Sequence, residues 1–183
     1  MGTDKAFLEL AGKPLISRAI ELARGATTDV QIVGDSEKFA AYGHVIGDVY
    51  RDRGPLGGIH AALTNSEAER NLMLAVDLPF LSAEFLKYLL ARSESSNATV
   101  TVPSVNGYFQ PLCAVYRKQF LTVAERALLE SRNKIDALFR EVSLCVVSEE
   151  DMVANGFDSV IFRNLNTPEE WQHAMRDFAA DSR

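Results

Sequence analysis

The sequence predicts an α/β protein built around a mostly parallel, doubly wound sheet. Short runs rich in strand-forming residues alternate with stretches whose apolar residues recur at helical spacing, and this alternation is typical of βαβ units. The 183 residues are enough for one large hydrophobic core, and no Pro/Gly/Ser-rich linker divides them. We therefore expect a single domain over residues 1–183.

Six runs are predicted to be strands, at residues 30–34, 44–49, 71–76, 98–102, 109–116 and 144–147. The run at 71–76, NLMLAV, is apolar almost throughout, which indicates a strand buried on both faces of a sheet. Helices are predicted within residues 15–23 and 81–90, where apolar side chains share one face.

Two further helices are predicted from capping residues at their ends. Ser148 and Asp151 predict a capping box at the start of a short helix that Gly156 ends. Thr167 and Pro168 predict the start of a last helix that runs to about residue 178.

The start of the chain departs from this fold. A doubly wound sheet normally begins with a strand that leads into a glycine-rich loop, whereas this sequence opens on what would follow such a loop. The expected first strand is absent from the 183 residues. An internal methionine taken as the start is the favoured explanation, and a natural short form is the other. The first explanation is favoured because a fold that lost a central strand would have a groove in its core, and the backbone groups of the neighbouring strands would be unpaired.

The composition excludes several classes of protein. With 47% hydrophobic and 24% charged residues the chain has a globular balance, and no apolar run approaches the roughly 20 residues that cross a bilayer. A net charge of −6 argues against a general nucleic-acid surface. The first ten residues lack the features of a signal peptide, so we expect a cytoplasmic protein. Cys113 and Cys145 are expected to be free thiols.

An aspartate follows directly on the predicted strand at 71–76. Because open α/β sheets bind ligands at the carboxyl ends of their strands, Asp77 is a candidate magnesium ligand. Magnesium uses few carboxylates together with substrate phosphates, so one aspartate is enough as an anchor. An aspartate that caps a helix or forms a turn is the alternative.

Residues 51–63, RDRGPLGGIHAAL, place Gly57 and Gly58 in the first turn of a helix that begins at Pro55. The missing side chains let a ligand approach the backbone, and free amides there suit an anion or the polar edge of a base. Tight packing of the helix on a strand explains the same glycines equally well.

Near the amino terminus, Lys5 is the candidate for neutralising triphosphate charge, and Lys13 is assigned to a turn.

Three segments, taken in order, resemble one family: MGTDKAFLELAGKPL at the start, RDRGPLGG with AVDLPF in the middle, and NLNTPEEW near the end. They resemble the molybdenum cofactor guanylyltransferases, whose pattern runs from a glycine-rich loop ending in Arg-Met-Gly through Asp-Lys, Gly-Pro-Leu-x-Gly, Asp-x-Pro and Asn-x-Asn-Thr-Pro-Glu. The likeness covers essentially the whole chain and implies a Rossmann-like three-layer nucleotidyltransferase fold. Of the glycine-rich loop, only Met1 and Gly2 are present.

The resemblance also implies the site. Lys5 would contact phosphate, Asp48 the nucleotide, and Asp77 both the nucleotide and a magnesium ion, which makes Lys5 and Asp77 the catalytic pair. Gly34 falls where the family often has a polar residue at the nucleotide, so its contact must come from the backbone.

The implied reaction transfers GMP from GTP to the phosphate of molybdopterin that bears molybdenum, and it releases pyrophosphate. The substrate supplies the nucleophile, so the protein aligns groups and neutralises charge. The second substrate is also polyanionic, and Arg51, Arg53, Arg132 and Lys134 could supply further positive charge. A monomer is expected, with transient contacts to proteins that deliver or accept the cofactor.

Other functions remain open at this stage. The nearest alternatives are a cytidylyltransferase that makes the cytosine form of the cofactor and a sugar-phosphate nucleotidyltransferase. A non-catalytic nucleotide-binding accessory protein is a third, because the phosphate loop is absent. A nicotinamide dehydrogenase is excluded, since no G-x-G-x-x-G follows a predicted strand.

Overall fold

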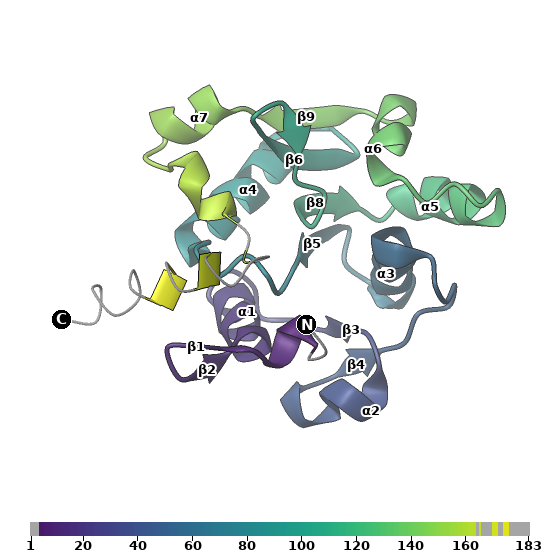
Figure 1. Cartoon of the computed structure of the whole chain (residues 1–183). Helices are drawn as coiled ribbons and strands as arrows, with labels where there is room; N and C mark the ends of the chain where they lie inside the picture. Colours follow the sequence, from purple (N-terminus) through teal and green to yellow (C-terminus); the bar gives the residue numbers. More distant parts are fainter. Residues whose placement is uncertain (1–3, 164, 166–169, 172–173, 176–183) are drawn as a thin grey trace.

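The computed structural model describes residues 4–163, 165, 170–171 and 174–175. Their order along the chain (Figure 1) is η1 (Lys5–Phe7), β1 (Glu9–Leu10), β2 (Lys13–Pro14), α1 (Leu15–Arg24), β3 (Ile32–Val33), α2 (Ser36–Phe39), η2 (Ala40–Tyr42), β4 (Val45–Ile46), α3 (Gly54–Asn65), β5 (Arg70–Leu74), α4 (Ala83–Ser95), β6 (Val100–Val105), β7 (Tyr108–Phe109), β8 (Cys113–Arg117), α5 (Phe120–Leu129), α6 (Ile135–Leu138), η3 (Phe139–Glu141), β9 (Leu144–Val147), α7 (Glu149–Ala154) and η4 (Ser159–Phe162).

The larger sheet has five strands and is mixed. Its order is β5-β8-β6-β7, with β9 on the other side of β6. Strand β8 is antiparallel to both β5 and β6, whereas β9 is parallel to β6, so β5, β6 and β9 share one direction. The prediction of a mostly parallel sheet therefore needs correction at β8.

The reversal of β8 has a local cause. Asn106 and Gly107, at φ 51° and 76°, form a two-residue turn that folds the chain straight back along β6. The predicted strand at 109–116 is accordingly split into β7 and β8, with residues 110–112 between them. No helix intervenes, so the pair is antiparallel.

Both faces of the larger sheet are covered by helices, which gives three layers (Figure 1). Along β8, Ala114 and Tyr116 join the core that α3, α5 and α6 complete. The alternate residues Cys113 and Val115 join the core beneath α4 and α7. This period of two is what a strand buried on both faces requires.

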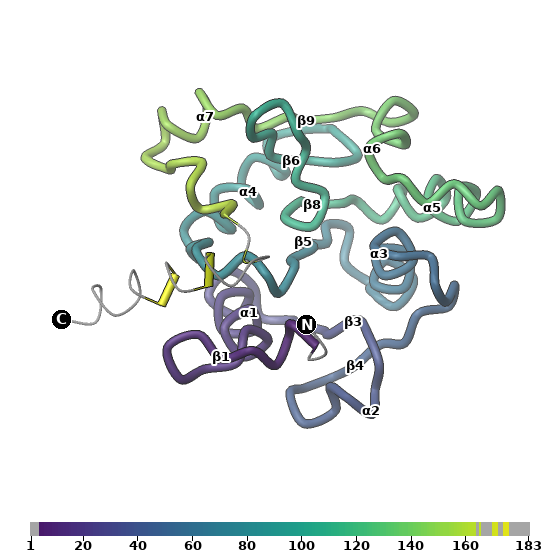
Figure 2. The backbone as a smooth tube through the Cα atoms, viewed as in Figure 1, coloured from purple at the N-terminus to yellow at the C-terminus, as the bar shows by residue number. Residues whose placement is uncertain are grey.

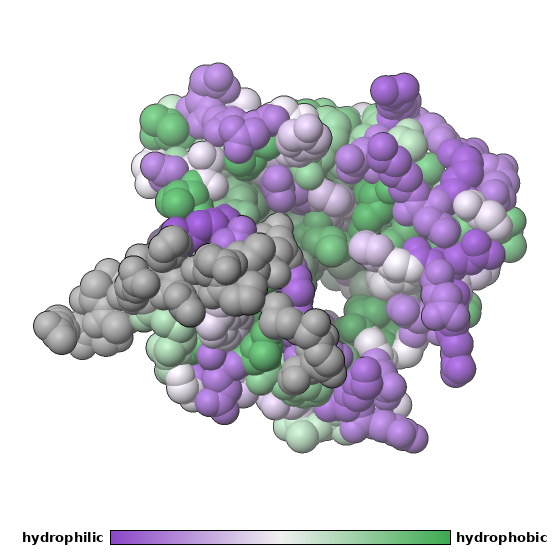
Figure 3. All heavy atoms as spheres, in the orientation of Figure 1, coloured by the Kyte–Doolittle hydropathy of each residue, from purple (hydrophilic) through white to green (hydrophobic). Residues whose placement is uncertain are grey.

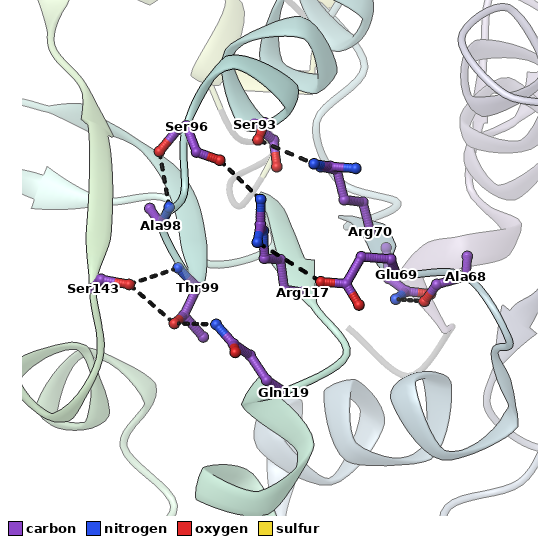
Figure 4. A network of polar contacts seen from close by, with 11 residues as sticks. Ala68, Glu69, Arg70, Ser93, Ser96, Ala98, Thr99, Arg117, Gln119 and Ser143 are labelled. Atoms are coloured by element: carbon purple, nitrogen blue, oxygen red, sulfur yellow. Dashed lines mark hydrogen bonds and ion pairs between the residues drawn. The ribbon is translucent and has the colours of Figure 1, made fainter.

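Two arginines tie the end of α4 to the sheet, as Figure 4 shows. Arg117 donates from a terminal guanidinium nitrogen to the Ser96 carbonyl at 2.9 Å and lies 3.8 Å from a Glu69 carboxylate oxygen. Arg70 Nε donates to the Ser93 carbonyl at 3.4 Å. These carbonyls lie in and just beyond the last turn of α4, where no intrahelical donors remain.

A second, smaller sheet consists of β3 and β4, which are parallel. Figure 2 shows the chain leaving α1, passing through β3, α2 and β4, and then continuing to α3. Between β3 and β5 lies a groove of about 550 Å³.

The groove also explains why β5 is less buried than the sequence predicts. All five residues of this strand are only half-buried, whereas four of the five in β8 are buried. The prediction that residues 71–76 are buried on both faces thus overestimated their burial, because one edge of the strand is open.

The predicted helices at 15–23 and 81–90 are confirmed as α1 and α4. The capping box of Ser148 and Asp151 is present, and Gly156 follows α7 with a φ of 84°. The predicted start of the last helix, at Thr167 and Pro168, lies outside the described residues. Within the part of the chain that the structure describes, no helix is both long and apolar enough to cross a bilayer.

Candidate functional site

Asp77 lies three residues beyond β5, at the carboxyl end of that strand, and is half-buried. The preceding residue, Val76, lines the groove and packs in a cluster that contains Ala6 and Ile20. Ala6 directly follows Lys5, and Val76 directly precedes Asp77. The segments that carry Lys5 and Asp77 therefore pack against the same apolar cluster. Lys5 and Asp77 are therefore neighbours in sequence of groove-lining residues, but neither is itself among the residues that line the groove.

The segment of Lys5 is held from several sides. The Asp4 carboxylate accepts a hydrogen bond from the Ala6 amide at 3.2 Å and lies 3.6 Å from Lys38 Nζ. Phe7 stacks on Phe39 of α2 with the ring centroids 5.4 Å apart. Sequence reasoning did not single out Asp4, which also lines the groove. An aspartate directly before a helical turn is the signal that could have indicated it.

Asp48 lies in the loop between β4 and α3, on the rim of the groove. The residue as a whole is exposed, but the groove walls partly shield its carboxyl group, and this burial raises the pKa of Asp48 above its usual value. A methyl group on Gly58 of α3 would lie 4.0 Å from Asp48 Oδ1. The nucleotide candidate and the glycine-rich helix therefore face one another.

The two glycines of α3 have different roles. A Cβ on Gly57 would lie 2.9 Å from the Tyr50 carbonyl oxygen, too close for a side chain, so packing explains this glycine. A Cβ on Gly58 would meet only ordinary contacts and would point into the groove. The packing interpretation therefore holds for Gly57, and at Gly58 the ligand interpretation stays a prediction. Gly54, not Pro55, is the first residue of the helix.

Gly34 follows β3, and its backbone amide is not available for the nucleotide contact that the sequence suggested. Its amide donates to the Ile46 carbonyl at 2.9 Å, so that donor is already used between β3 and β4. Its glycine identity has a steric reason, since a Cβ would lie 2.9 Å from Phe39 Cε2. A nucleotide contact at Gly34 would have to use the carbonyl oxygen.

Other candidates are engaged elsewhere. Lys13 Nζ lies 2.7 Å from Glu21, in agreement with its assignment outside the site. Arg132 is held by Glu130 and Glu141 at 2.8 and 2.7 Å, so its charge is already paired. Among the described residues no group of three or more His, Cys, Asp or Glu side chains is placed to hold a metal. A magnesium ion that is bound by one or two carboxylates and substrate phosphates does not need such a group.

The fold is shared with solved nucleotidyltransferases. The structure of molybdopterin-guanine dinucleotide biosynthesis protein A from Archaeoglobus fulgidus matches with a TM-score of 0.83 and 26% identity, covering 98% of this chain and 92% of that one. The 2-C-methyl-D-erythritol 4-phosphate cytidylyltransferase from Thermus thermophilus matches with a TM-score of 0.72 at 14% identity, over 96% and 94% of the two chains, which shows the fold alone. The protein is a nucleotidyltransferase.

Sequence comparisons define the family more closely. The model of the MobA-like NTP transferase domain matches residues 1–145, and the chain belongs to this family. A probable molybdenum cofactor guanylyltransferase of Pelotomaculum thermopropionicum is 34% identical over 185 residues, which cover 100% of this chain and 89% of that protein. The molybdenum cofactor guanylyltransferase of Desulfosudis oleivorans is 33% identical over 94% of this chain and 86% of that protein.

Proposed function

We propose that this protein transfers GMP from GTP to the phosphate of molybdenum-bearing molybdopterin and releases pyrophosphate. The observation that carries the proposal is that Asp48, Gly58 and Val76 line one groove, and Val76 directly precedes Asp77. The relatives named molybdenum cofactor guanylyltransferase over nearly the whole chain support the choice of substrates.

In this reaction a phosphate oxygen of the molybdopterin substrate forms a bond to the α-phosphorus of GTP. The bond between that phosphorus and the bridging oxygen of the β-phosphate breaks, and pyrophosphate leaves with the electron pair. No side-chain nucleophile is required, so the residues act by alignment and by neutralising charge. We assign Lys5 to the triphosphate, and Asp48 and the Gly34 carbonyl to the nucleoside.

We assign magnesium to Asp77. The half-buried carboxylate at the end of β5 fits a hard cation that prefers oxygen ligands, and substrate phosphates would supply further oxygens. When bound, the ion would offset the charge that develops on the phosphate oxygens. A single domain over residues 1–183, a cytoplasmic location and a monomeric state stay predictions of the sequence.

Competition between nucleotides tests the substrate. Pyrophosphate release is measured with GTP, CTP, UTP and ATP at equal concentration, with molybdenum-bearing molybdopterin as acceptor. We expect GTP to be preferred. A preference for CTP would replace the proposal by the cytidylyltransferase alternative.

Asp77→Asn tests the metal role, and Glu94→Gln, an exposed change on α4, is the matched loss of a carboxylate. We expect Asp77→Asn to lose the magnesium-dependent part of GTP binding, at least about tenfold or about 1.4 kcal/mol, while Glu94→Gln keeps it. Unchanged GTP affinity and magnesium dependence in Asp77→Asn would favour a non-catalytic binding protein.

A further inference from the structure

The larger sheet has an open border at β9, remote from the groove that Figure 3 shows as an opening in the surface. Strand β9 pairs with β6 on one side, and among the residues that the structure describes no strand pairs with its other side. In Figure 1 it lies at the border of the molecule, between α6 and α7. The strand that flanks the groove, β5, is at the opposite end of the strand order, so the border at β9 is separate from the candidate nucleotide site.

The backbone groups on the outer side of β9 belong to Leu144 and Val146. The Ser143 carbonyl accepts a hydrogen bond from the Thr99 amide at 2.9 Å, so it points towards β6. By the alternation of a parallel ladder, the groups of Cys145 also point towards β6, and those of Leu144 and Val146 point outwards. Within the described part of the chain, the outward N–H and C=O groups have no hydrogen-bond partner.

The outer edge of β9 is complementary to itself, because Leu144 and Val146 flank Cys145 symmetrically. If a second β9 runs antiparallel about a two-fold axis at Cys145, Leu144 of one copy faces Val146 of the other. Such a pair exchanges both of its backbone hydrogen bonds. The two Cys145 residues form the intervening non-hydrogen-bonded pair, with their Cα atoms about 4.5 Å apart. All outward groups of the edge are then satisfied.

The charges at the two ends of β9 have opposite sign. Arg140 in η3 precedes the strand and Glu150 in the first turn of α7 follows it, and both residues are exposed. Neither side chain is in an ion pair with another described residue. Both lie at the same distance in sequence from Cys145, so the two-fold axis brings Arg140 of each copy to Glu150 of the other. A parallel arrangement would bring like charges together, so the charges favour the antiparallel one.

The segment between these charges offers nothing that prevents pairing. Residues 142–148, VSLCVVS, contain no charged residue and no proline, which are the residues that commonly block an edge strand. Val146 is exposed, so its side chain would gain burial against a second copy. Because β9 has only four residues, the interface is small and the association is weak.

We propose that β9 is a homodimerisation edge. A second copy of this chain pairs with it antiparallel about Cys145, and the two larger sheets become one continuous sheet. The monomer that the sequence predicts is then the form at low concentration. The proposal does not rest on the proposed function, because Asp77 follows β5 at the opposite border.

Sedimentation of the full chain between about 1 and 500 µM tests the association. We expect a concentration-dependent dimer. Val146→Pro removes an outward N–H at a position where an edge strand tolerates proline, and it should weaken the dimer at least about tenfold. Val146→Thr keeps both the N–H and the β-branched shape and should retain the dimer. A monomer at every concentration, or a dimer that Val146→Pro does not weaken, would overturn the proposal.

A charge exchange tests the two-fold arrangement without altering the strand. Arg140→Glu and Glu150→Arg should each weaken the dimer, and the double variant should restore it. Within one chain the extended segment between the two residues spans roughly 20 Å, so restoration requires a contact between copies. If Val146→Pro does not fold, this exchange decides the question: a double variant as weak as the single ones would contradict the antiparallel pairing.

Cys145 supplies a direct reporter of the register. Its expected Cα separation from the second Cys145 lies within the range for a disulfide, whereas Cys113 is fully buried. Diamide oxidises the two thiols by taking up two electrons and two protons, and the covalent dimer is mapped by mass spectrometry. We expect a bond between two Cys145 residues, no covalent dimer in Cys145→Ser, and at least about tenfold slower cross-linking in Val146→Pro. Equal cross-linking rates in Val146→Pro and the unaltered chain would indicate random collision and contradict the proposal.

Nucleotide binding separates this proposal from the proposed function. If the dimer forms through β9 but the chain does not bind GTP, the dimerisation edge stands and the proposed function fails. If the chain binds GTP and is a monomer at every concentration, the proposed function stands and the dimerisation edge fails.

Discussion

Gly58 of α3 faces the carboxylate of Asp48: a methyl group on Gly58 would lie 4.0 Å from Asp48 Oδ1 and 3.6 Å from Val33 Cγ1. Both distances are ordinary van der Waals contacts, so the helix has room for alanine at this position. The same space is what a nucleotide needs if it is to approach the helix backbone beside Asp48.

The Gly58→Ala variant should therefore change stability and binding in opposite directions. Alanine in a helix interior is more favourable than glycine by about 0.5–1 kcal/mol, so the Tm should rise. GTP affinity should fall by at least about tenfold, because the methyl group takes the space at the backbone. Calorimetry and thermal unfolding measure the two effects.

Thr64→Ala, an exposed change on the same helix, is the control. It should raise helix propensity without altering GTP affinity. If Gly58→Ala binds GTP as tightly as Thr64→Ala does, the nucleotide does not lie against this turn of α3.

Asp48→Asn tests whether the groove carboxylate opposes folding. Because burial raises the pKa of Asp48, the protonated form is favoured in the folded state. The stability that this group contributes is present below its unfolded pKa and is lost as the pH rises through the folded value. At neutral pH the ionised group is unfavourable, so Asp48→Asn should have an equal or higher Tm in the absence of ligand.

The same variant should bind GTP more weakly. A lower Tm for Asp48→Asn at neutral pH, with unchanged GTP affinity, would mean that the carboxylate has a structural role instead.

Much of the fold could be predicted because its signals are local. The capping box at Ser148, the amphipathic faces of α1 and α4, and the strand at β9 all depend on residues within a few positions of each other. The direction of β8 depended on a local signal too, Asn106 followed by Gly107, which is typical of a tight hairpin. The sequence prediction of one strand at 109–116 did not use it.

The candidate site was predictable only in part. Asp77 follows from the position of a carboxylate after an apolar strand. The different surroundings of Gly57 and Gly58 could not be predicted, because they depend on the Tyr50 carbonyl and on Asp48, which reach these glycines through the loop between β4 and α3. Likewise, the engagement of the Gly34 amide depends on the pairing of β3 with β4.

His60 should make stability depend on pH in the acid range. Its ring is buried in α3 against Tyr50, with the centroids 4.9 Å apart, and burial lowers its pKa although Glu125 acts in the opposite sense. The neutral form is thus favoured in the folded state, and the stability it contributes is present above the unfolded pKa of about 6.5. That stability is lost as the pH falls through this value towards the folded pKa.

His60→Phe keeps an aromatic ring beside Tyr50 and removes the titration. Between about pH 7 and 5 its Tm should fall less than that of the unaltered protein. His44→Gln, at an exposed position, should retain the original pH dependence. Parallel curves for the unaltered protein and His60→Phe would exclude this role.

Arg117 should contribute more to stability than an arginine in an exposed ion pair. Its side chain is 17% exposed, and it supplies a charged donor to the Ser96 carbonyl after α4, as Figure 4 shows. A hydrogen bond to a charged group contributes about 1.5–3 kcal/mol, and Arg117→Met should lower the free energy of unfolding by that amount. Arg126→Met, which breaks an exposed pair with Glu141, should have a much smaller effect because solvent screens that pair. Urea unfolding measures both, and equal losses would show that the Ser96 carbonyl is satisfied without Arg117.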